Sequence, residues 1–277
     1  MHKPHLTRLV SAVIVVAAGL RIMAGAATAA TPKDALNTGL KAVDAGQTEA
    51  ALKNLNEAFG GGEADAGFYL GRLVETGMGL AVDMPKAFEL YKLAASRGST
   101  KALNRLGMLA LEGRAVKQDL ARGRTLVCEA AAKGDADGAV NCAGLLADGR
   151  GGPADLPQAL KYYQSAADRG HIAAHLALGF AHVQGTGTAK NLRQAQVHFE
   201  HAASRGNPVA LFELGQMFEA GGSVARDLGK AHLYFTLAAA KGHGTAEQAM
   251  QRAARSLSVA QTEASRDAAV SWRAVEN

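Results

Sequence analysis

Apolar residues recur at helical spacing along most of the chain, in paired segments joined by glycine-bearing turns. The segment that starts at Ala102 is an example, because Leu106, Leu109 and Ala110 share one face of a predicted helix. A second helical segment follows a glycine-rich loop and closes on Ala-Ala-x-x-Gly, as in KYYQSAADRG at 161–170. The alanines permit close helix approach, and the glycine can adopt the left-handed geometry that ends a helix. The pattern therefore predicts helix hairpins.

The predicted hairpins repeat with a period of 36 residues. Five closing glycines mark this period: Gly98, Gly134, Gly170, Gly206 and Gly242. An Asp or Asn stands in each repeat where the second helix needs an N-cap acceptor, namely Asp83, Asp119, Asp155, Asn191 and Asp227. Aligned on Ala143-Gly144, the third repeat is one residue shorter in its central loop. Because each repeat packs only on its neighbours, we expect one elongated domain.

The succession A-x-x-x-L-G, G-x-G, D-x-x-K-A and A-A-x-x-G at this period resembles the Sel1-like repeat family, in its exported bacterial type, a relative of tetratricopeptide repeats. The resemblance spans residues 64–244 and has few departures. Ala143 replaces the family leucine, and Gly123 and Gln158 depart at the K-A position. The resemblance implies an all-α fold, a right-handed α/α solenoid of five Sel1-like helix hairpins.

Degenerate segments flank the repeats and are predicted to cap the array. Residues 31–63 keep the two-helix rhythm in weaker form, as a terminal repeat with only one neighbour should. Residues 245–277 are predicted to form C-terminal capping helices. Ser258 and Gln261 have the spacing of a capping box that starts the last of them.

Residues 1–30 have the layout of a secretory signal peptide. Lys3 and Arg8 flank the start of an apolar run that ends at Leu20, which is shorter than the ~20 helical residues that span a bilayer. We therefore expect export to the periplasm or beyond, with no stable membrane insertion after the signal is removed. Arg21 interrupts the segment before the cleavage site and keeps an uncleaved membrane anchor as the less favoured alternative.

Charge and composition argue against a nucleic-acid ligand. The net charge is +5, but residues 1–30 hold three of the bases and no acid, so their removal leaves 27 bases against 25 acids. Bases and acids are interspersed along the repeats, and no Lys/Arg block remains. We therefore predict no nucleic-acid partner.

The candidate catalytic and metal-binding groups complete no known motif. His171 and His175 form HIAAH, but Ile172 stands where a zinc metalloprotease needs a glutamate. His198 and His201 lie one turn apart in slots that hold Leu, Tyr or Thr elsewhere. The glycine loops do not continue into a P-loop, and Ser-x-x-Lys, Ser-Asp-Asn and Lys-Thr-Gly are absent. We predict a non-enzymatic protein without metal or cofactor.

The two cysteines leave two alternatives open. Cys128 and Cys142 flank the Gly134 turn almost symmetrically, and an exported protein meets an oxidising compartment, which favours a disulfide. Against it, the alignment places them in variable, outward slots equivalent to Lys92 and Arg105. Two free thiols are the alternative.

The first helices carry a variable stripe on one face, and in helical solenoids these helices line the concave groove. The candidate partner-binding residues on the stripe are Tyr69, Arg72, Arg105, Met108, Leu145, Phe180, Glu213 and Gln216. Aromatic residues, Met and Arg are enriched in binding patches. The competing interpretation is that Tyr69, Leu145 and Phe180 only pack between helices.

Three hypotheses about function follow. The resemblance implies an exported, non-enzymatic repeat scaffold that binds a protein or peptide ligand in the concave groove, with a regulatory role at the bacterial cell envelope. The alternative is a protein that binds or hydrolyses cell-wall fragments or β-lactams. A third hypothesis is a purely structural part of an envelope complex.

Overall fold

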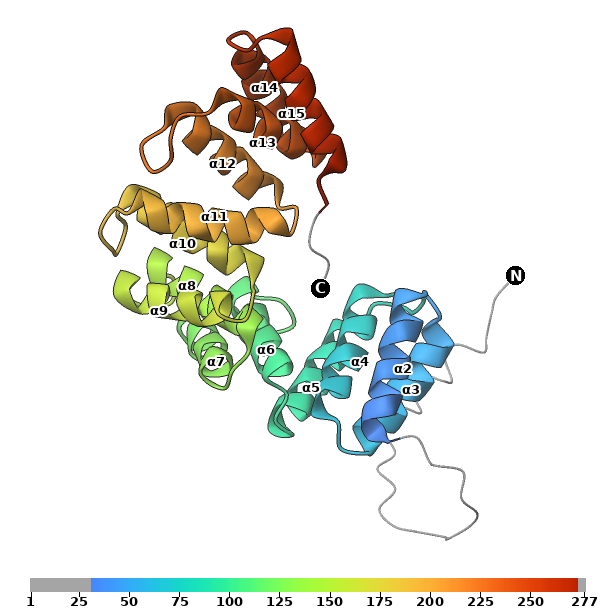
Figure 1. The fold of residues 1–277 in the computed structure, drawn as a ribbon. Coiled ribbons are helices and arrows are strands. Elements are labelled where there is room, and N and C mark those ends of the chain that lie inside the picture. Colours follow the sequence, from blue (N-terminus) through green and yellow to red (C-terminus); the bar gives the residue numbers. More distant parts are fainter. Residues whose placement is uncertain (1–30, 274–277) are drawn as a thin grey trace. The chain divides into compact units, whose positions relative to one another are not determined.

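The computed structural model describes residues 31–273, and these hold fourteen α-helices and no β-strand (Figure 1). The predicted signal peptide, residues 1–30, lies outside the described residues. No helix within the described range is long and apolar enough to cross a membrane. The helices are α2 (Pro32–Asp44), α3 (Thr48–Gly60), α4 (Ala64–Thr76), α5 (Met84–Ser96), α6 (Thr100–Glu112), α7 (Leu120–Ala132), α8 (Ala136–Asp148), α9 (Leu156–Ala167), α10 (Ile172–Gln184), α11 (Leu192–Ser204), α12 (Pro208–Ala220), α13 (Leu228–Ala240), α14 (Ala246–Ala254) and α15 (Val259–Ser271).

The predicted hairpins form, so that the described chain is an all-α repeat solenoid in which α4, α6, α8, α10 and α12 are first helices and α5, α7, α9, α11 and α13 are second helices. Every predicted N-cap at the start of a second helix is confirmed. The side chain of Asp83, for example, accepts a hydrogen bond from the Lys86 N–H at 3.0 Å. The five closing glycines have φ between 74° and 101°, a backbone geometry that L-residues with side chains rarely adopt.

The first, fourth and fifth hairpins each close around a glycine in the middle of the first helix, with an aromatic ring of the second helix against it. The second hairpin has Val127 against Gly107, and the third has Ala143 at the glycine position. A Cβ on Gly71 would lie 2.5 Å from Cε1 of Tyr91, and a Cβ on Gly179 would lie 2.5 Å from Cε1 of Phe199. Both rings are fully buried. The ring of the second helix therefore lies directly on the backbone of the first, in space that any side chain would occupy.

The third repeat has the same length as the others, so the prediction of a shorter loop is wrong. Its first helix starts at Ala136, which is 36 residues after Thr100 and 36 residues before Ile172. This register places Cys142 at the position of Leu106, and Cys142 is fully buried. The misalignment arose because Ala143-Gly144 imitates the Leu-Gly pair one residue too late.

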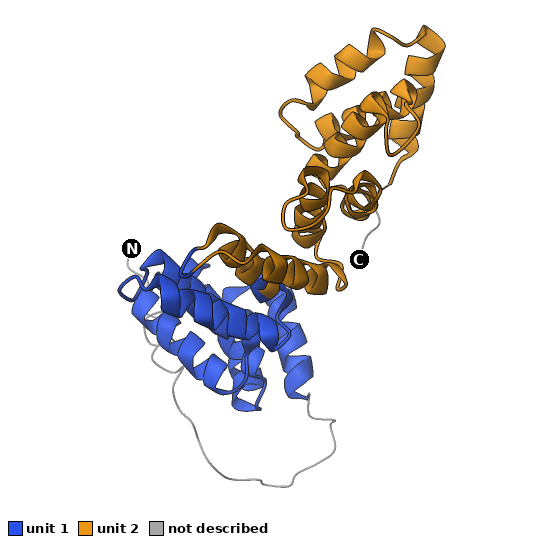
Figure 2. Cartoon of the chain, turned by 90° about the vertical axis from the view of Figure 1, so that its left-hand side faces the viewer, with its two compact units in different colours: residues 1–138, 150–152 blue, residues 139–149, 153–277 orange. Residues whose placement is uncertain are grey.

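The chain divides into two compact units (Figure 2). Unit 1 comprises residues 1–138 and 150–152, and its described helices pack around buried side chains that include Leu55, Leu70 and Leu109. The α2–α3 hairpin belongs to this core, with Leu55 fully buried on α3.

Unit 2 comprises residues 139–149 and 153–277. Phe199, Leu211 and Leu214 are among the buried side chains of its core. The predicted capping box is confirmed at the start of α15, where Gln261 N–H donates to Ser258 Oγ at 3.2 Å and Ser258 N–H donates to Gln261 Oε1 at 2.9 Å.

Replacing Gly179 tests whether ring-on-backbone contact holds the hairpins together. We expect Gly179→Val to lower the free energy of unfolding by about 1–3 kcal/mol, because the new side chain overlaps the Phe199 ring. Urea denaturation followed by circular dichroism measures the change.

Gly144→Ala is the matched control in the same unit. A Cβ there meets only Tyr163 Oη, at an ordinary 3.7 Å, and alanine has the higher helix propensity, so stability should stay equal or rise. A Gly179→Val variant as stable as this control would contradict the proposed contact.

Candidate functional site

A buried carboxylate lies in unit 1, at a repeat position that the second, third and fourth repeats fill with apolar residues. The fifth repeat has Glu219 there, but that side chain is 24% exposed and pairs with Arg252. Glu75 on α4 is 6% exposed, whereas the same position holds Leu111 on α6 and Val183 on α10. Tyr91 on α5 donates its hydroxyl to Glu75 Oε2 at 2.7 Å. A buried charge is costly unless it is paired, so the partners of Glu75 determine whether the site is stable.

One arginine of the same helix and two of the next hairpin supply those partners. Arg105 on α6 donates its Nε hydrogen to Glu75 Oε2 at 3.0 Å, and its Nη2 contacts Glu75 Oε1. Arg72 Nη1 lies 3.7 Å from Glu75 Oε2, and Arg114 Nη1 lies 3.6 Å from Glu75 Oε1. Glu112 Oε1 accepts from Arg105 Nη1 at 3.4 Å. We call these five residues with Tyr91 the arginine cluster.

The surroundings of Glu75 favour its ionised form. Burial raises the pKa of Glu75, but hydrogen bonds from Arg105 and Tyr91 and the nearby positive charges outweigh it, so the pKa is lowered. Burial and the bond to Glu75 raise the pKa of Tyr91, which therefore remains a donor. Three guanidinium groups face two carboxylates, and the side chains of Arg72 and Arg114 are 46% and 51% exposed. The cluster thus presents excess positive charge at the surface.

In unit 1 the structure brings two of the four predicted stripe residues of α4 and α6 to one site. Arg72 and Arg105 meet at Glu75, and Tyr69 and Met108 are half-buried on the same two helices. Sequence reasoning missed Glu75 and Arg114. The available signal was a glutamate at a position where the next repeat has leucine.

In unit 2 the predicted stripe residues differ in burial and do not form one site. Leu145 is 7% exposed and lies in the core, because the corrected register makes it the equivalent of Leu109. The ring of half-buried Phe180 packs edge-on against Phe199, with centroids 5.3 Å apart. Glu213 is half-buried, and burial raises its pKa. Gln216 is exposed.

Both cysteines are disulfide-bonded in the structure, and no described cysteine is free. Cys128 lies on α7 and is half-buried, whereas Cys142 lies on α8 and is fully buried. The placement of Cys142 in an outward slot like that of Arg105 is therefore wrong, for the same one-residue error of register.

The Sel1 repeat model matches five consecutive stretches of the chain, residues 64–99, 100–135, 136–171, 172–207 and 208–243. The chain belongs to the Sel1 repeat family. Each matched Sel1 repeat contains one of the hairpins described above, and the third has the full length. Sel1 repeat proteins generally mediate protein–protein interactions and are typically non-catalytic.

Solved structures of other Sel1 repeat proteins have the same fold. A Sel1 repeat protein from Oxalobacter formigenes is 25% identical, with a TM-score of 0.72, over 85% of this chain and 98% of that one. A protective antigen of uropathogenic Escherichia coli strains with an SLR fold is 23% identical, with a TM-score of 0.71. That match covers 87% of this chain, which spans 54% of the antigen's length. No curated protein matches the chain.

Four histidines of the fourth Sel1 repeat gather between α10 and α11 in unit 2. The Nδ1 atoms of His175 and His198 lie 3.1 Å apart. His201 stacks on His175 with ring centroids 4.7 Å apart, and His182 stacks on His198 at 5.7 Å. No group of three or more His, Cys, Asp or Glu side chains in the described part of the chain is arranged to hold a metal ion.

The contact between His175 and His198 requires that at least one of these two imidazoles is neutral. Two Nδ1 atoms in contact can share only one proton, and burial lowers the pKa of both His175 and His198, to about 4 for His198. Repulsion from a protonated neighbouring imidazole would also oppose protonation of His175 and His198, whereas Asp168 at the end of α9 favours it.

A Ser–His contact in unit 2 lacks the arrangement of a nucleophile and its base. His232 Nδ1 lies 2.6 Å from Ser265 Oγ, and both side chains are buried. Ser265 donates its hydroxyl hydrogen to the Thr262 carbonyl at 2.9 Å, so it accepts from His232 rather than being activated by it. The pair joins α15 to α13.

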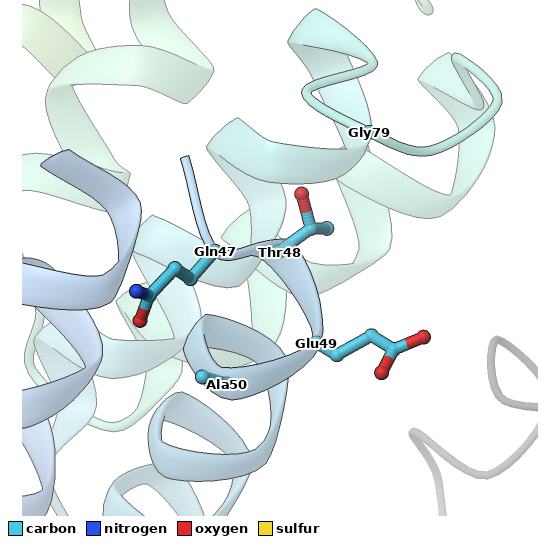
Figure 3. Close-up of a pocket in the computed structure, with 5 residues that line it drawn as sticks. All are labelled: Gln47, Thr48, Glu49, Ala50 and Gly79. Atoms are coloured by element: carbon cyan, nitrogen blue, oxygen red, sulfur yellow. The ribbon is translucent and has the colours of Figure 1, made fainter. Parts of the chain in front are cut away.

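A hollow at the start of α3 is a packing contact of the first Sel1 repeat. Figure 3 shows Thr48 directed toward Gly79 of the α4–α5 loop, with Gln47 and Glu49 directed away from it. Thr48 Oγ1 donates to the Met78 carbonyl at 3.1 Å. Because no charged groups converge there, the hollow has no feature of a ligand site.

Replacing His198 tests the histidine cluster. An unfolded histidine titrates near 6.5 and folded His198 near 4, so between these values the unfolded state binds more protons. The free energy of unfolding should therefore fall as pH is lowered from about 7 to 4, with His198 contributing on the order of 1–3 kcal/mol.

The variant His198→Leu, which introduces the residue found at this position as Leu90 and Leu126, should lose that part of the dependence. Urea denaturation at a series of pH values is the measurement, and His243→Gln, outside the cluster, is the control that keeps the slope. An identical slope for His198→Leu and the natural chain would refute the assignment.

Proposed function

We propose that this protein is an exported, non-enzymatic scaffold that binds a protein or peptide partner on its first helices in the bacterial cell envelope. The arginine cluster on α4 and α6 carries the proposal. It buries a charge at a position where the second and fourth repeats have Leu111 and Val183, and where the glutamate of the fifth repeat, Glu219, stays partly exposed. Packing of the repeat does not require Glu75, and this is what favours a role in binding.

The cluster has the properties of a preorganised anchor. Arg105 is held by Glu75 and Glu112, which reduces the conformational entropy that a partner must remove on binding. Arg72 remains about half exposed, with half-buried Tyr69 three residues before it on α4 and half-buried Met108 on α6, and these residue types are enriched at protein interfaces. A partner with an acidic side chain next to an apolar one fits this surface. In the proposed solenoid geometry the first helices line the concave groove.

The envelope location is proposed from the sequence of residues 1–30, with its basic start, short apolar run and small residues before the cleavage site. A periplasmic location also suits a chain whose two cysteines are bonded, because the periplasm is oxidising. Regulation of an envelope sensor or assembly is the role that we propose for such binding.

Site-specific photo-crosslinking tests the binding surface. A photoreactive phenylalanine analogue at Tyr69 or at Met108 leaves the charged groups of the cluster intact. We expect both positions to crosslink the same envelope protein in living bacteria, detected by mass spectrometry. The matched controls are Leu93 on α5 and Val197 on α11, which are 40% and 42% exposed on second helices and should give no such product.

A charge variant sharpens the crosslinking test. Arg72→Gln should lower the crosslink yield at Met108 roughly fivefold to tenfold, because it removes a partly exposed charge that pairs with the partner. Arg105 is left in place because its loss would leave Glu75 buried without its main partner. Crosslinks from Leu93 and Val197 alone, or yields unaffected by Arg72→Gln, would place the partner elsewhere.

Intact mass measured under non-reducing conditions tests export and the disulfide together. Protein isolated from the periplasm should lack the N-terminal segment that ends near Ala30, and it should resist thiol alkylation until a reductant is added. A full-length chain in the membrane fraction would support the uncleaved anchor, and two alkylated thiols without reductant would rule out the bond.

A further inference from the structure

A pocket lies in unit 1 between α5, α6, α7 and the loop that precedes α7, and it shares no lining residue with the arginine cluster. Its volume is about 480 Å³, which falls in the range of small-molecule pockets. Phe88, Leu106 and Leu126 contribute the main apolar side chains, one from each helix. Sequence analysis did not single out any of these three residues as a binding group.

The rim of this pocket is cationic. Lys92, Lys117 and Arg122 line it together with one acid, Asp119. Lys92 is already paired, since its Nζ lies 3.1 Å from both carboxylate oxygens of Glu89. Within residues 31–273, neither Lys117 nor Arg122 forms an ion pair with a carboxylate.

Asp119 does not neutralise these two cations. Its Oδ1 accepts the Arg122 backbone N–H at 2.9 Å, because Asp119 is the N-cap of α7. The carboxylate therefore serves the helix terminus, where backbone donors and the positive end of the helix dipole hold it. The side chains of Lys117 and Arg122 are left exposed at the rim.

The repeat does not explain the presence of Lys117. At the equivalent position the other four repeats have small or apolar residues, namely Ala81, Pro153, Ala189 and Ala225. A lysine here is therefore not needed to form a Sel1 hairpin. It adds a charge to the edge of an apolar hollow in the second repeat.

We infer that this pocket binds a small anionic amphiphile, a carboxylate with an unbranched aliphatic chain. The chain lies against Phe88, Leu106 and Leu126, and the carboxylate pairs with Lys117 and Arg122. The apolar floor disfavours a sugar, which would leave its hydroxyl groups without partners there, and the unpaired cations disfavour a positively charged head group. This inference is independent of the proposed partner on the first helices.

Isothermal titration of the purified protein with decanoate, below its micelle concentration, tests the inference. We expect saturable binding of one decanoate per chain. Decyltrimethylammonium, which has the same chain and the opposite charge, should bind at least tenfold more weakly. Equal affinity for the two probes, or no saturable decanoate binding, would overturn the inference.

A double charge reversal locates the site. Lys117→Glu combined with Arg122→Glu should weaken decanoate binding at least tenfold, and circular dichroism should show unchanged helix content because both side chains are exposed. The control is Lys161→Glu combined with Arg193→Glu, two exposed residues of unit 2 with the same change in net charge. Decanoate binding that is equal in the two double variants would be non-specific and would overturn the assignment.

Discussion

Close approach of the second helix to the middle of the first is the constraint on which the hairpins depend, and in three of the five an aromatic ring lies on a glycine there. Tyr91 and Phe199 lie where a Cβ of Gly71 or Gly179 would stand, and both rings are fully buried. A side chain at either glycine would force the helices apart, because protein interiors have no spare volume. The glycine, the ring and the alanines that end the second helix thus set the helix spacing. Positions that serve neither this spacing nor the helix ends are free to vary.

The unusual side chains of unit 1 lie at positions that are free to vary or add a polar group to a residue that the hairpin needs. Tyr91 has the aromatic ring that the hairpin needs, and its hydroxyl also supplies a donor that a phenylalanine would lack. That donor, together with Arg105 from the next hairpin, allows Glu75 to be buried in its charged form. The same geometry that closes the hairpin therefore supports a charged site, and the two hairpins are linked through one carboxylate.

How much could be predicted from the sequence depended on how local each feature is. The N-cap at Asp83 and the capping box at Ser258 need only neighbouring residues, and both were predicted correctly. The register of the third repeat was predicted incorrectly, because Ala143-Gly144 resembles the Leu-Gly pair. Only the spacing of the folded helices shows that Cys142 takes the leucine position.

Contacts between helices were harder to predict from sequence than the helices themselves. His175 and His198 are 23 residues apart and share no short sequence motif, yet their Nδ1 atoms meet between α10 and α11. Glu75 lies four residues after Gly71, and this position does not belong to the predicted stripe on the first helices. In both cases the informative observation is a polar side chain at a position that is apolar in other repeats.

The departures from the repeat pattern are therefore the best guide to what this scaffold does. Lys117, His198 and Glu75 each replace residues that satisfy the same position elsewhere in the chain, such as Ala81, Leu90 and Leu111. Each replacement puts a polar side chain where packing alone would favour an apolar or small one. Lys117 becomes an unpaired surface cation, His198 a neutral buried imidazole and Glu75 a paired buried carboxylate. Since five repeats share one architecture, differences in architecture cannot give them separate roles, and the specificity of each repeat must lie in these substitutions.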